Sequence, residues 1–147
     1  MQQINEIRNA PVSQFMTREV ATIDGSQTVS EAIKIMRQQK ISSVVVNPRN
    51  QDDTWGIVTE RDILSKVVDP GEDTFKDIWN TKVHEIMSKP VISIGPALRV
   101  KYAIRMMHKM RIRRLLVLEG TKLSGIISET NILHAVEELP VHHDTAL

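Results

Sequence analysis

The 147-residue chain carries one apolar pattern twice, and this repeat constrains its fold more than any other feature. Residues 12–46 match residues 83–117 at an offset of 71. The matched pairs include Val12 with Val83, Met16 with Met87, Val29 with Val100, Ala32 with Ala103 and Ile41 with Ile112. Beyond them the offset falls to 69, where GIVTERDIL (56–64) matches GIISETNIL (125–133), so the second copy has lost two residues in the preceding loop. A match of this length indicates duplication and predicts two similar halves.

Each copy predicts the order β-α-β-β-α. A short extended stretch comes first, VATI (20–23) or VISI (91–94). A helix follows, because apolar residues recur at the i, i+3, i+4, i+7 spacing of one buried face. These residues are Val29, Ala32, Ile33 and Met36 in the first copy, and Val100, Ala103, Ile104 and Met107 in the second. ISSVVV (41–46) or RLLVL (114–118), followed by GIV or GII, predicts a hairpin, and a second helix starts near Thr59 or Ser128.

The two copies are expected to fold together. One copy holds about 60 residues and three strands, which is marginal for independent stability. We therefore predict an α/β fold in which two small mixed three-stranded sheets pack together about a pseudo-twofold axis, with the helices outside. Thr28 and Glu31 predict a capping box at the first long helix, whereas Arg99 replaces the cap in the second copy. The predicted organisation is repeat 1 at 11–68, a polar Pro-Gly linker at 69–82, repeat 2 at 83–138 and a flexible tail at 139–147.

Composition and missing motifs exclude several functions. The chain has no cysteine, which excludes disulfides, thiolate metal sites and cysteine nucleophiles. Its net charge of +1 points to no class of partner. No apolar run approaches the roughly 20 residues of a membrane span, and MQQINEIRNA lacks the apolar segment of a signal peptide, so a cytoplasmic protein without a membrane partner is expected. No G-x-S-x-G, Walker A or H-E-x-x-H motif is present, and we predict neither catalytic residues nor a metal site. The pair His142-His143 could bind metal weakly, but a solvated tail is the favoured interpretation.

The repeated features resemble a tandem pair of CBS domains, often called a Bateman module. The resemblance covers about residues 11–138. It rests on V-x-x-F/I-M at 12–16 and 83–87, the V-x-x-I strands, the amphipathic helices, the hairpins and G-h-h-T/S-x-x-D/N at 56–62 and 125–131. It implies a stand-alone regulatory CBS pair that binds an adenine nucleotide or adenosyl ligand in clefts between the repeats and is associated with a regulated enzyme or transporter. It also implies a homodimer, with the helix at 100–110 as a candidate contact surface.

The T-x-x-D motif has a structural and a functional interpretation. Thr59 and Asp62 stand three residues apart at a helix start, as do Ser128 and Asn131, so both pairs could simply cap helices. A capped helix N-terminus also favours anions, and a carboxylate can accept hydrogen bonds from two vicinal ribose hydroxyls. The resemblance implies this ligand role for both pairs. Because Asn131 lacks charge, we expect the weaker ribose clamp there.

In the family each motif faces the first strand of the other repeat, which implies two sets of ligand-binding residues. Cleft A is expected to contain Thr17, Val20, Ala21, Thr22, Arg113, Arg114, Ser128 and Asn131. Cleft B is expected to contain Val91, Ile92, Ser93, Ser43, Thr59 and Asp62. Arg113 and Arg114 would meet the phosphates, where the first copy has Ser42 and Ser43. The alternatives are ordinary strand burial and solvated charges at a strand end.

Three functions therefore stand at this point. The favoured one is a sensor for AMP, with ADP, ATP or S-adenosylmethionine as other ligands of the same class, and without a cofactor. The second is an interaction module of the same fold that binds no ligand. The third is a nucleic-acid binder, because residues 86–118 contain eight Lys or Arg and no Asp or Glu. Tyr102 is the sole aromatic residue of that segment, which argues against base stacking.

Overall fold

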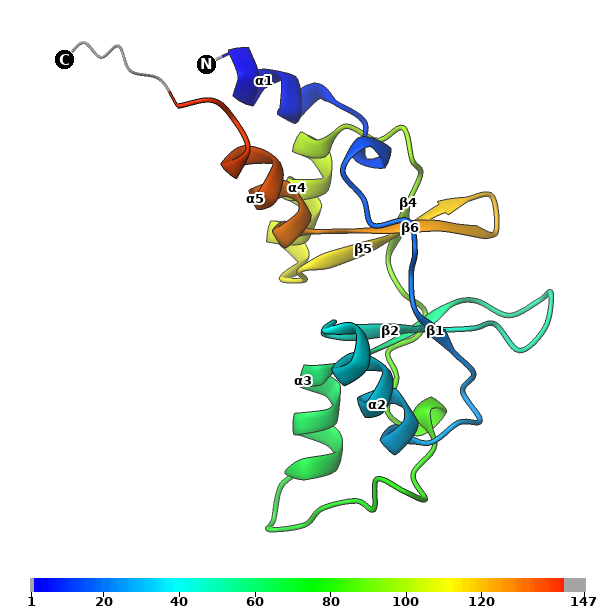
Figure 1. Ribbon diagram of the computed structural model, residues 1–147. Helices are drawn as coiled ribbons and strands as arrows, with labels where there is room; N and C mark the ends of the chain where they lie inside the picture. The colour runs from blue at the N-terminus through cyan, green and yellow to red at the C-terminus, as the bar shows by residue number, and fades with distance from the viewer. Residues whose placement is uncertain (1, 142–147) are drawn as a thin grey trace. The chain divides into compact units, whose positions relative to one another are not determined.

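A computed structural model describes residues 2–141, which form two compact units (Figure 1). Unit 1 joins residues 2–19 to 92–141, and unit 2 comprises Val20–Val91. Unit 1 contains α1 (Gln2–Asn9), η1 (Val12–Gln14), β4 (Ser93–Ile94), α4 (Val100–Met110), β5 (Arg114–Glu119), β6 (Lys122–Ser128) and α5 (Glu129–Glu137). Unit 2 contains β1 (Thr22–Ile23), α2 (Val29–Gln39), β2 (Ser43–Val46), β3 (Gly56–Thr59), α3 (Glu60–Ile63), the π turn η2 (Leu64–Val68) and η3 (Val83–Glu85). Residues 142–147 of the predicted tail, with His142 and His143, lie outside the described residues.

Each unit holds one three-stranded mixed sheet, so the predicted α/β class and the β-α-β-β-α order are confirmed. In unit 2 the order is β1-β2-β3, with β1 parallel and β3 antiparallel to β2. In unit 1 the order is β4-β5-β6 with the same directions. The two-residue deletion falls in the β5–β6 hairpin, whose ladder continues past an irregularity at Val117/Leu118 to the pair Glu119–Lys122. The first strands of both sheets are edge strands of two residues each.

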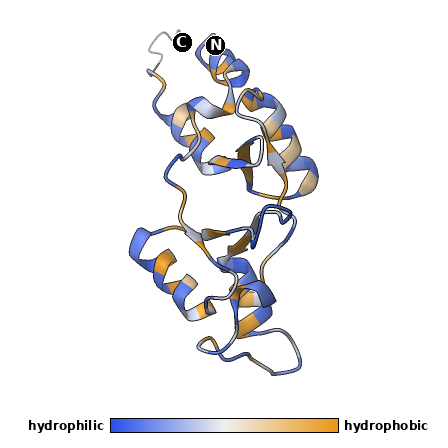
Figure 2. Ribbon diagram, turned by 90° about the vertical axis from the view of Figure 1, so that its right-hand side faces the viewer, coloured by the Kyte–Doolittle hydropathy of each residue, from blue (hydrophilic) through white to orange (hydrophobic). Residues whose placement is uncertain are grey.

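The helices of each unit cover one face of its sheet with the predicted apolar stripe. In unit 2 the stripe of Val29, Ala32 and Met36 packs with Val44 and Val58 in one buried cluster. In unit 1 the equivalent cluster comprises chiefly Val100, Ala103, Met107, Leu115, Val117, Ile127 and Ile132. Figure 2 shows polar and apolar residues alternating around these helices. The side chains that fill both clusters are almost entirely aliphatic or methionine, as expected for a chain with 3% aromatic residues.

The caps at the helix starts agree only in part with those predicted from the sequence. Thr28 Oγ1 accepts a hydrogen bond from the backbone N–H of Glu31 at 3.2 Å, as predicted. The carboxylate of Glu31 instead accepts from Gln27 Nε2 at 2.6 Å, so the reciprocal half of the expected capping box is not made there. Arg99 provides no side-chain cap to α4, as its residue type predicts. Helix α1 was not predicted, and its Ile7 is buried in the core of unit 1.

The segment before each first strand pairs with the hairpin of the other repeat. Thr17 exchanges two backbone hydrogen bonds with Ile126, at 2.9 and 3.0 Å, within unit 1. Ser88 exchanges two with Ile57, at 3.0 and 2.8 Å, within unit 2. A Cβ on Gly125 would lie 2.7 Å from the carbonyl oxygen of Thr17, so this close strand crossing requires glycine. The crossing explains the glycine of this motif in the second repeat, whereas a Cβ on Gly56 would lie 3.4 Å from the carbonyl oxygen of Ser88.

Candidate functional site

In unit 2 the motif builds a complete capping box at the start of α3. Thr59 Oγ1 accepts from the backbone N–H of Asp62 at 3.1 Å. In return Asp62 Oδ2 accepts from the backbone N–H and the hydroxyl of Thr59, at 2.9 and 3.0 Å. Asp62 Oδ1 forms an ion pair with Lys66 Nζ at 3.2 Å. The Asp62 side chain is 13% exposed, so it is open to solvent at one edge.

These contacts leave limited hydrogen-bonding capacity on Asp62. A carboxylate offers about four lone-pair sites, of which the two on Oδ2 are used by Thr59 and one on Oδ1 by Lys66. A ribose hydroxyl can therefore bind at Oδ1 directly, or at both oxygens if Thr59 yields one contact. Lys66 Nζ also donates to the carbonyl of Ile86 at 3.0 Å, which fixes the ammonium group beside Asp62.

Unit 1 repeats the capping box with neutral side chains. Asn131 Oδ1 accepts from the backbone N–H and the hydroxyl of Ser128, both at 2.9 Å, and Ser128 Oγ accepts from the backbone N–H of Asn131 at 3.1 Å. Asn131 Nδ2 donates to Thr17 Oγ1 at 3.2 Å. The structure therefore brings together Thr17, Ser128 and Asn131, which the family resemblance had placed in one set.

The strand register places the first residue of each hairpin opposite the hydroxyl residue of the capping box. Arg114 is the antiparallel partner of Ser128, and Ser43 is the partner of Thr59. Side chains of such directly opposite residues lie side by side on the sheet. The half-buried Arg114 thus joins the group around Ser128, whereas Arg113 is exposed and its carbonyl accepts from the backbone N–H of Glu129 at 3.0 Å. The arginines are consequently in the unit that contains Asn131, as the repeat alignment implied.

The remaining predicted residues lie on the edge strands or beside them. Val20, Ala21 and Thr22 belong to unit 2, where the carbonyl of Ala21 accepts from Val45 at 3.0 Å. Val91 ends unit 2, and Ile92 and Ser93 begin the second part of unit 1, where the carbonyl of Ile92 accepts from Leu116 at 3.2 Å. Because β1 and β4 are edge strands, one side of each presents backbone groups that no sheet neighbour uses.

A cavity of about 490 Å³ in unit 1 includes Asn131 in its wall. Ile7, Phe15 and other apolar side chains line it, together with Glu6 and Glu138. Among the described residues that line it there is no lysine or arginine. This cavity is therefore electrostatically unsuited to phosphate, unlike the start of β5 with its two arginines.

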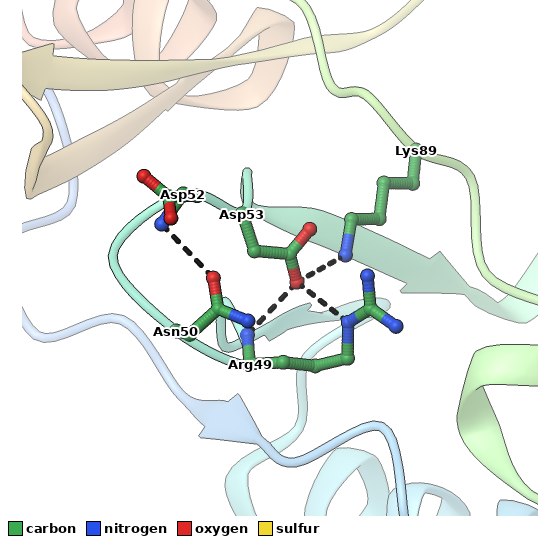
Figure 3. A network of polar contacts seen from close by, with 5 residues as sticks. All are labelled: Arg49, Asn50, Asp52, Asp53 and Lys89. Carbon is green, nitrogen blue, oxygen red and sulfur yellow. Dashed lines mark hydrogen bonds and ion pairs between the residues drawn. The ribbon is translucent and has the colours of Figure 1, made fainter.

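The sequence analysis missed two ionic contacts. Lys66 stands four residues after Asp62, the spacing of a helical ion pair, which could have indicated it. The second contact is centred on Asp53 (Figure 3). Asp53 Oδ2 accepts from Lys89 Nζ at 2.6 Å, from the backbone N–H of Arg49 at 2.8 Å and from Arg49 Nε at 3.1 Å. This carboxylate is buried to 8% exposure, and Lys89 above all holds its pKa well below the ordinary value. No sequence spacing indicates a pair 36 residues apart.

The described part of the chain shows neither a cluster of metal ligands nor a membrane-spanning helix. Residues 2–141 contain no group of three or more His, Asp or Glu side chains placed to hold a metal ion. No helix within them has the length and apolar character needed to cross a membrane.

Comparison with known proteins identifies the fold. The sequence profile of the CBS domain matches residues 12–69 and again 83–138. The chain belongs to the CBS-domain family. It holds two CBS domains in tandem, the organisation of a regulatory module, and stand-alone CBS-domain proteins are among its relatives. The CBS domain-containing protein YhcV of Bacillus subtilis is 32% identical over 117 residues, which cover 80% of this chain and 79% of YhcV.

Other CBS proteins extend beyond the matched region. The uncharacterized protein MK0525 of Methanopyrus kandleri is 34% identical over 128 residues, and this chain spans 63% of its length. The inosine-5'-monophosphate dehydrogenase of Methanocaldococcus jannaschii matches over 24% of its own length. The hexameric CBS-CP12 protein from bloom-forming cyanobacteria has a similar structure, with a TM-score of 0.78 and 42% identity over 85% of this chain and 67% of that one. CBSX2, solved in complex with AMP, shares the fold at a TM-score of 0.74 and 20% identity, over 90% and 99% of the two chains.

Proposed function

We propose that this CBS pair is a non-enzymatic sensor that binds an adenine nucleotide, AMP in the first place, and reports its level to a partner protein. The observation that carries the proposal is the repeated polar group at each helix start, in which a hydroxyl residue and an Asp or Asn stand beside the first residue of a hairpin strand. Because duplication would also repeat a purely structural cap, the ligand role rests on what the caps present: an acceptor of Asp62 that is partly open to solvent, and Arg114 beside Ser128. The AMP complex of CBSX2, a protein of the same fold, supports the ligand class.

The two sites would differ in what they hold. Asp62 offers a charged acceptor to ribose hydroxyls, with Lys66 as a competitor for the same oxygen. Asn131 offers a neutral amide, and Arg114 across the ladder from Ser128 supplies charge for a phosphate. The Asn131 site is therefore better suited to a phosphate, and the Asp62 site is better suited to ribose hydroxyls. Backbone groups of the edge strands β1 and β4 would contact the adenine.

Calorimetric titration with AMP, ADP, ATP and S-adenosylmethionine at millimolar concentration tests the proposal. Asp62→Asn copies the natural residue of the other repeat and is expected to weaken one class of site about tenfold. Arg114→Ala should lower affinity for AMP more than for adenosine, while Arg105→Ala, an exposed arginine of α4, serves as the matched control. Absence of heat with all four ligands would reject nucleotide sensing and favour an interaction module that binds no ligand.

Nucleic-acid binding is the third function, and two contacts of the Tyr102 ring argue against it. Lys101 Nζ and the Arg105 guanidinium both lie over the ring of Tyr102, 5.3 and 5.4 Å from its centre. The ring that could stack on a base is therefore already engaged by cations of its own helix. Salt-dependent retention of DNA or RNA, lost on neutralising Arg111 and Arg113, would overturn this conclusion.

A nucleotide relays information only if two conformational states of the protein bind it with different affinity. We therefore expect AMP to change the association of this module with a regulated enzyme or transporter, or with a second copy. The helix α4 remains the predicted contact surface for a homodimer. Sedimentation with and without AMP measures this coupling.

A further inference from the structure

The cavity of about 490 Å³ in unit 1, called the α1–α5 cavity here, is formed by two helices from opposite ends of the chain. Helix α1 packs beside α5 (Figure 1). Glu6 and Ile7 of α1 line the cavity from one side, and Ala135 of α5 with Glu138 after it line it from the other. Sites for small molecules have volumes of roughly 300–1,000 Å³. The α1–α5 cavity is therefore large enough to hold one.

The inner surface of the α1–α5 cavity is apolar. Ile7 is buried in the core cluster of unit 1, and Phe15, Ala135 and Leu139 are half-buried against the same cluster. These side chains are partly covered by the protein and partly open to the cavity. An apolar group that covered them would gain hydrophobic burial, and an aromatic group would also gain a ring contact with Phe15. The cavity therefore favours a ligand with an apolar body.

The mouth of the α1–α5 cavity carries negative charge. Glu6 and Glu138 are both exposed, and in the described part of the chain neither forms an ion pair. Helix α5 contains no lysine or arginine. Arg8, the one cation of α1, donates to Asn5 Oδ1 at 3.1 Å and does not line the cavity. The two carboxylates are thus available to a cation from outside.

Asn131 is where this cavity meets the residues assigned to nucleotide binding. Its Oδ1 accepts two hydrogen bonds from Ser128, and its Nδ2 donates one to Thr17. Selection of a ligand by charge therefore depends on Glu6 and Glu138 rather than on this amide. A phosphate would find two carboxylates at the mouth, so the ligand of the cavity differs in chemistry from a nucleotide.

We propose that the α1–α5 cavity binds a small organic amine. The ammonium group lies between Glu6 and Glu138, because its three N–H donors can serve both carboxylates. The aryl or alkyl body packs on Phe15 and Leu139. His134 also lines the cavity and is a further acceptor while its imidazole is neutral. The proposal concerns unit 1 alone and does not depend on nucleotide binding.

NMR titration of the full ¹⁵N-labelled chain with 2-phenylethylamine tests the proposal. At about pH 7.5 the ligand is a cation and most of the imidazole is neutral. Saturable shifts are expected at the amides of Phe15, Ala135 and Leu139, with a dissociation constant in the millimolar range for so small a ligand. No nucleotide is present, so the result is independent of the proposed sensor function.

Two matched ligands separate charge from apolar contact. 2-Phenylethanol has the same body without the charge, and 3-phenylpropanoate has a similar body with the opposite charge. The alcohol should bind about fivefold more weakly than the amine, because exposed ion pairs contribute modestly. The carboxylate should give no saturable shifts. Equal affinities for the three ligands would show a site that selects apolar groups only, and would overturn the proposal.

A matched pair of variants locates the charge. Glu138→Gln should raise the dissociation constant of the amine about two- to fivefold, and Glu6→Gln with Glu138→Gln about tenfold. Glu137→Gln makes the same change one residue earlier, at a position that does not line the cavity, and should leave the constant unchanged at about 0.15 M salt. Ala135→Leu should abolish binding by filling the cavity. Retained circular dichroism and melting temperature establish that these variants are folded.

Three results would overturn the assignment of the amine to this cavity. The first is an absence of saturable shifts with 2-phenylethylamine. The second is a set of shifts confined to residues outside the α1–α5 cavity. The third is an equal loss of affinity in Glu137→Gln and Glu138→Gln, which would indicate attraction by the overall charge of the helix end.

Discussion

Replacing Gly125 by alanine provides the sharpest test of how the preceding segment crosses the hairpin. The added Cβ would lie 2.7 Å from the backbone oxygen of Thr17 and 2.7 Å from Met16 Sδ. A sulfur at the end of a flexible side chain can move, but the Thr17 oxygen belongs to a chain that exchanges two hydrogen bonds with Ile126. The clash must therefore strain or break this pairing.

The magnitude follows from the terms involved. Overpacking costs about 1–3 kcal/mol, and a weakened backbone hydrogen bond adds about 1 kcal/mol. The lower entropy of the unfolded chain returns about 0.4–1 kcal/mol, because alanine is less flexible than glycine. We expect Gly125→Ala to lower the free energy of unfolding by about 2–3 kcal/mol. Gly56→Ala should lower it by less than about 1 kcal/mol, since its nearest contacts are Met87 Sδ at 3.0 Å and the Ser88 oxygen at 3.4 Å.

Urea denaturation followed by circular dichroism measures the difference. At slopes of about 1–3 kcal/mol per molar urea, the midpoint of Gly125→Ala should fall by about 1 M or more. Gly95→Ala is the control, because no heavy atom lies within 4 Å of its added Cβ. If Gly56→Ala destabilised the chain as much as Gly125→Ala, the close approach of the Thr17 oxygen would not be the reason for glycine at position 125.

Three further predictions concern the cap, the ion pair and the core. Ser128→Ala should lower the free energy of unfolding by about 1 kcal/mol in the same assay, through loss of the helix cap, and a value near zero would contradict that role. Lys89 holds the pKa of Asp53 below its ordinary 3.8, so the carboxylate stabilises the fold above that pH and this stabilisation disappears as the pH falls further. Urea midpoints recorded between about pH 6 and pH 2 should fall less steeply for Asp53→Asn than for the native chain, and parallel curves would refute the assignment. Leu115→Ala, at a fully buried position of β5, should cost about 3 kcal/mol, and a loss below about 1 kcal/mol would show that the core closes around the gap.

Local periodicity predicted most of the fold. The spacing of Val29, Ala32 and Met36 identified α2 and its buried face, and the same spacing identified α4. The N-terminal helix escaped prediction because its polar sequence holds only two apolar side chains, Ile4 and Ile7, within α1. Its stability comes from packing Ile7 into unit 1, which is a tertiary effect.

The candidate site was predictable only where residues are close in sequence. The pairs Thr59–Asp62 and Ser128–Asn131 follow from capping rules, because three residues separate their members. Asn131 and Thr17 are 114 residues apart, and only the family resemblance assigned them to the same set of residues. The ion pair of Lys66 with Asp62 was missed although its helical spacing could have indicated it. The contact of Asp53 with Lys89 depends on where two loops meet, which no local pattern encodes.

The segment that precedes each first strand pairs with the hairpin of the other repeat, and this limits where the chain can be cut. Residues 2–19 complete the unit built on the second repeat, and residues 83–91 complete the unit built on the first. A cut in the linker at 69–82 therefore separates each hairpin from the segment that pairs with it, Thr17 from Ile126 and Ser88 from Ile57. Neither fragment is whole alone, and the two should regain structure only when mixed, as complementing halves do. A protein with a single repeat of this kind would need the leading segment of a second copy to complete its sheet.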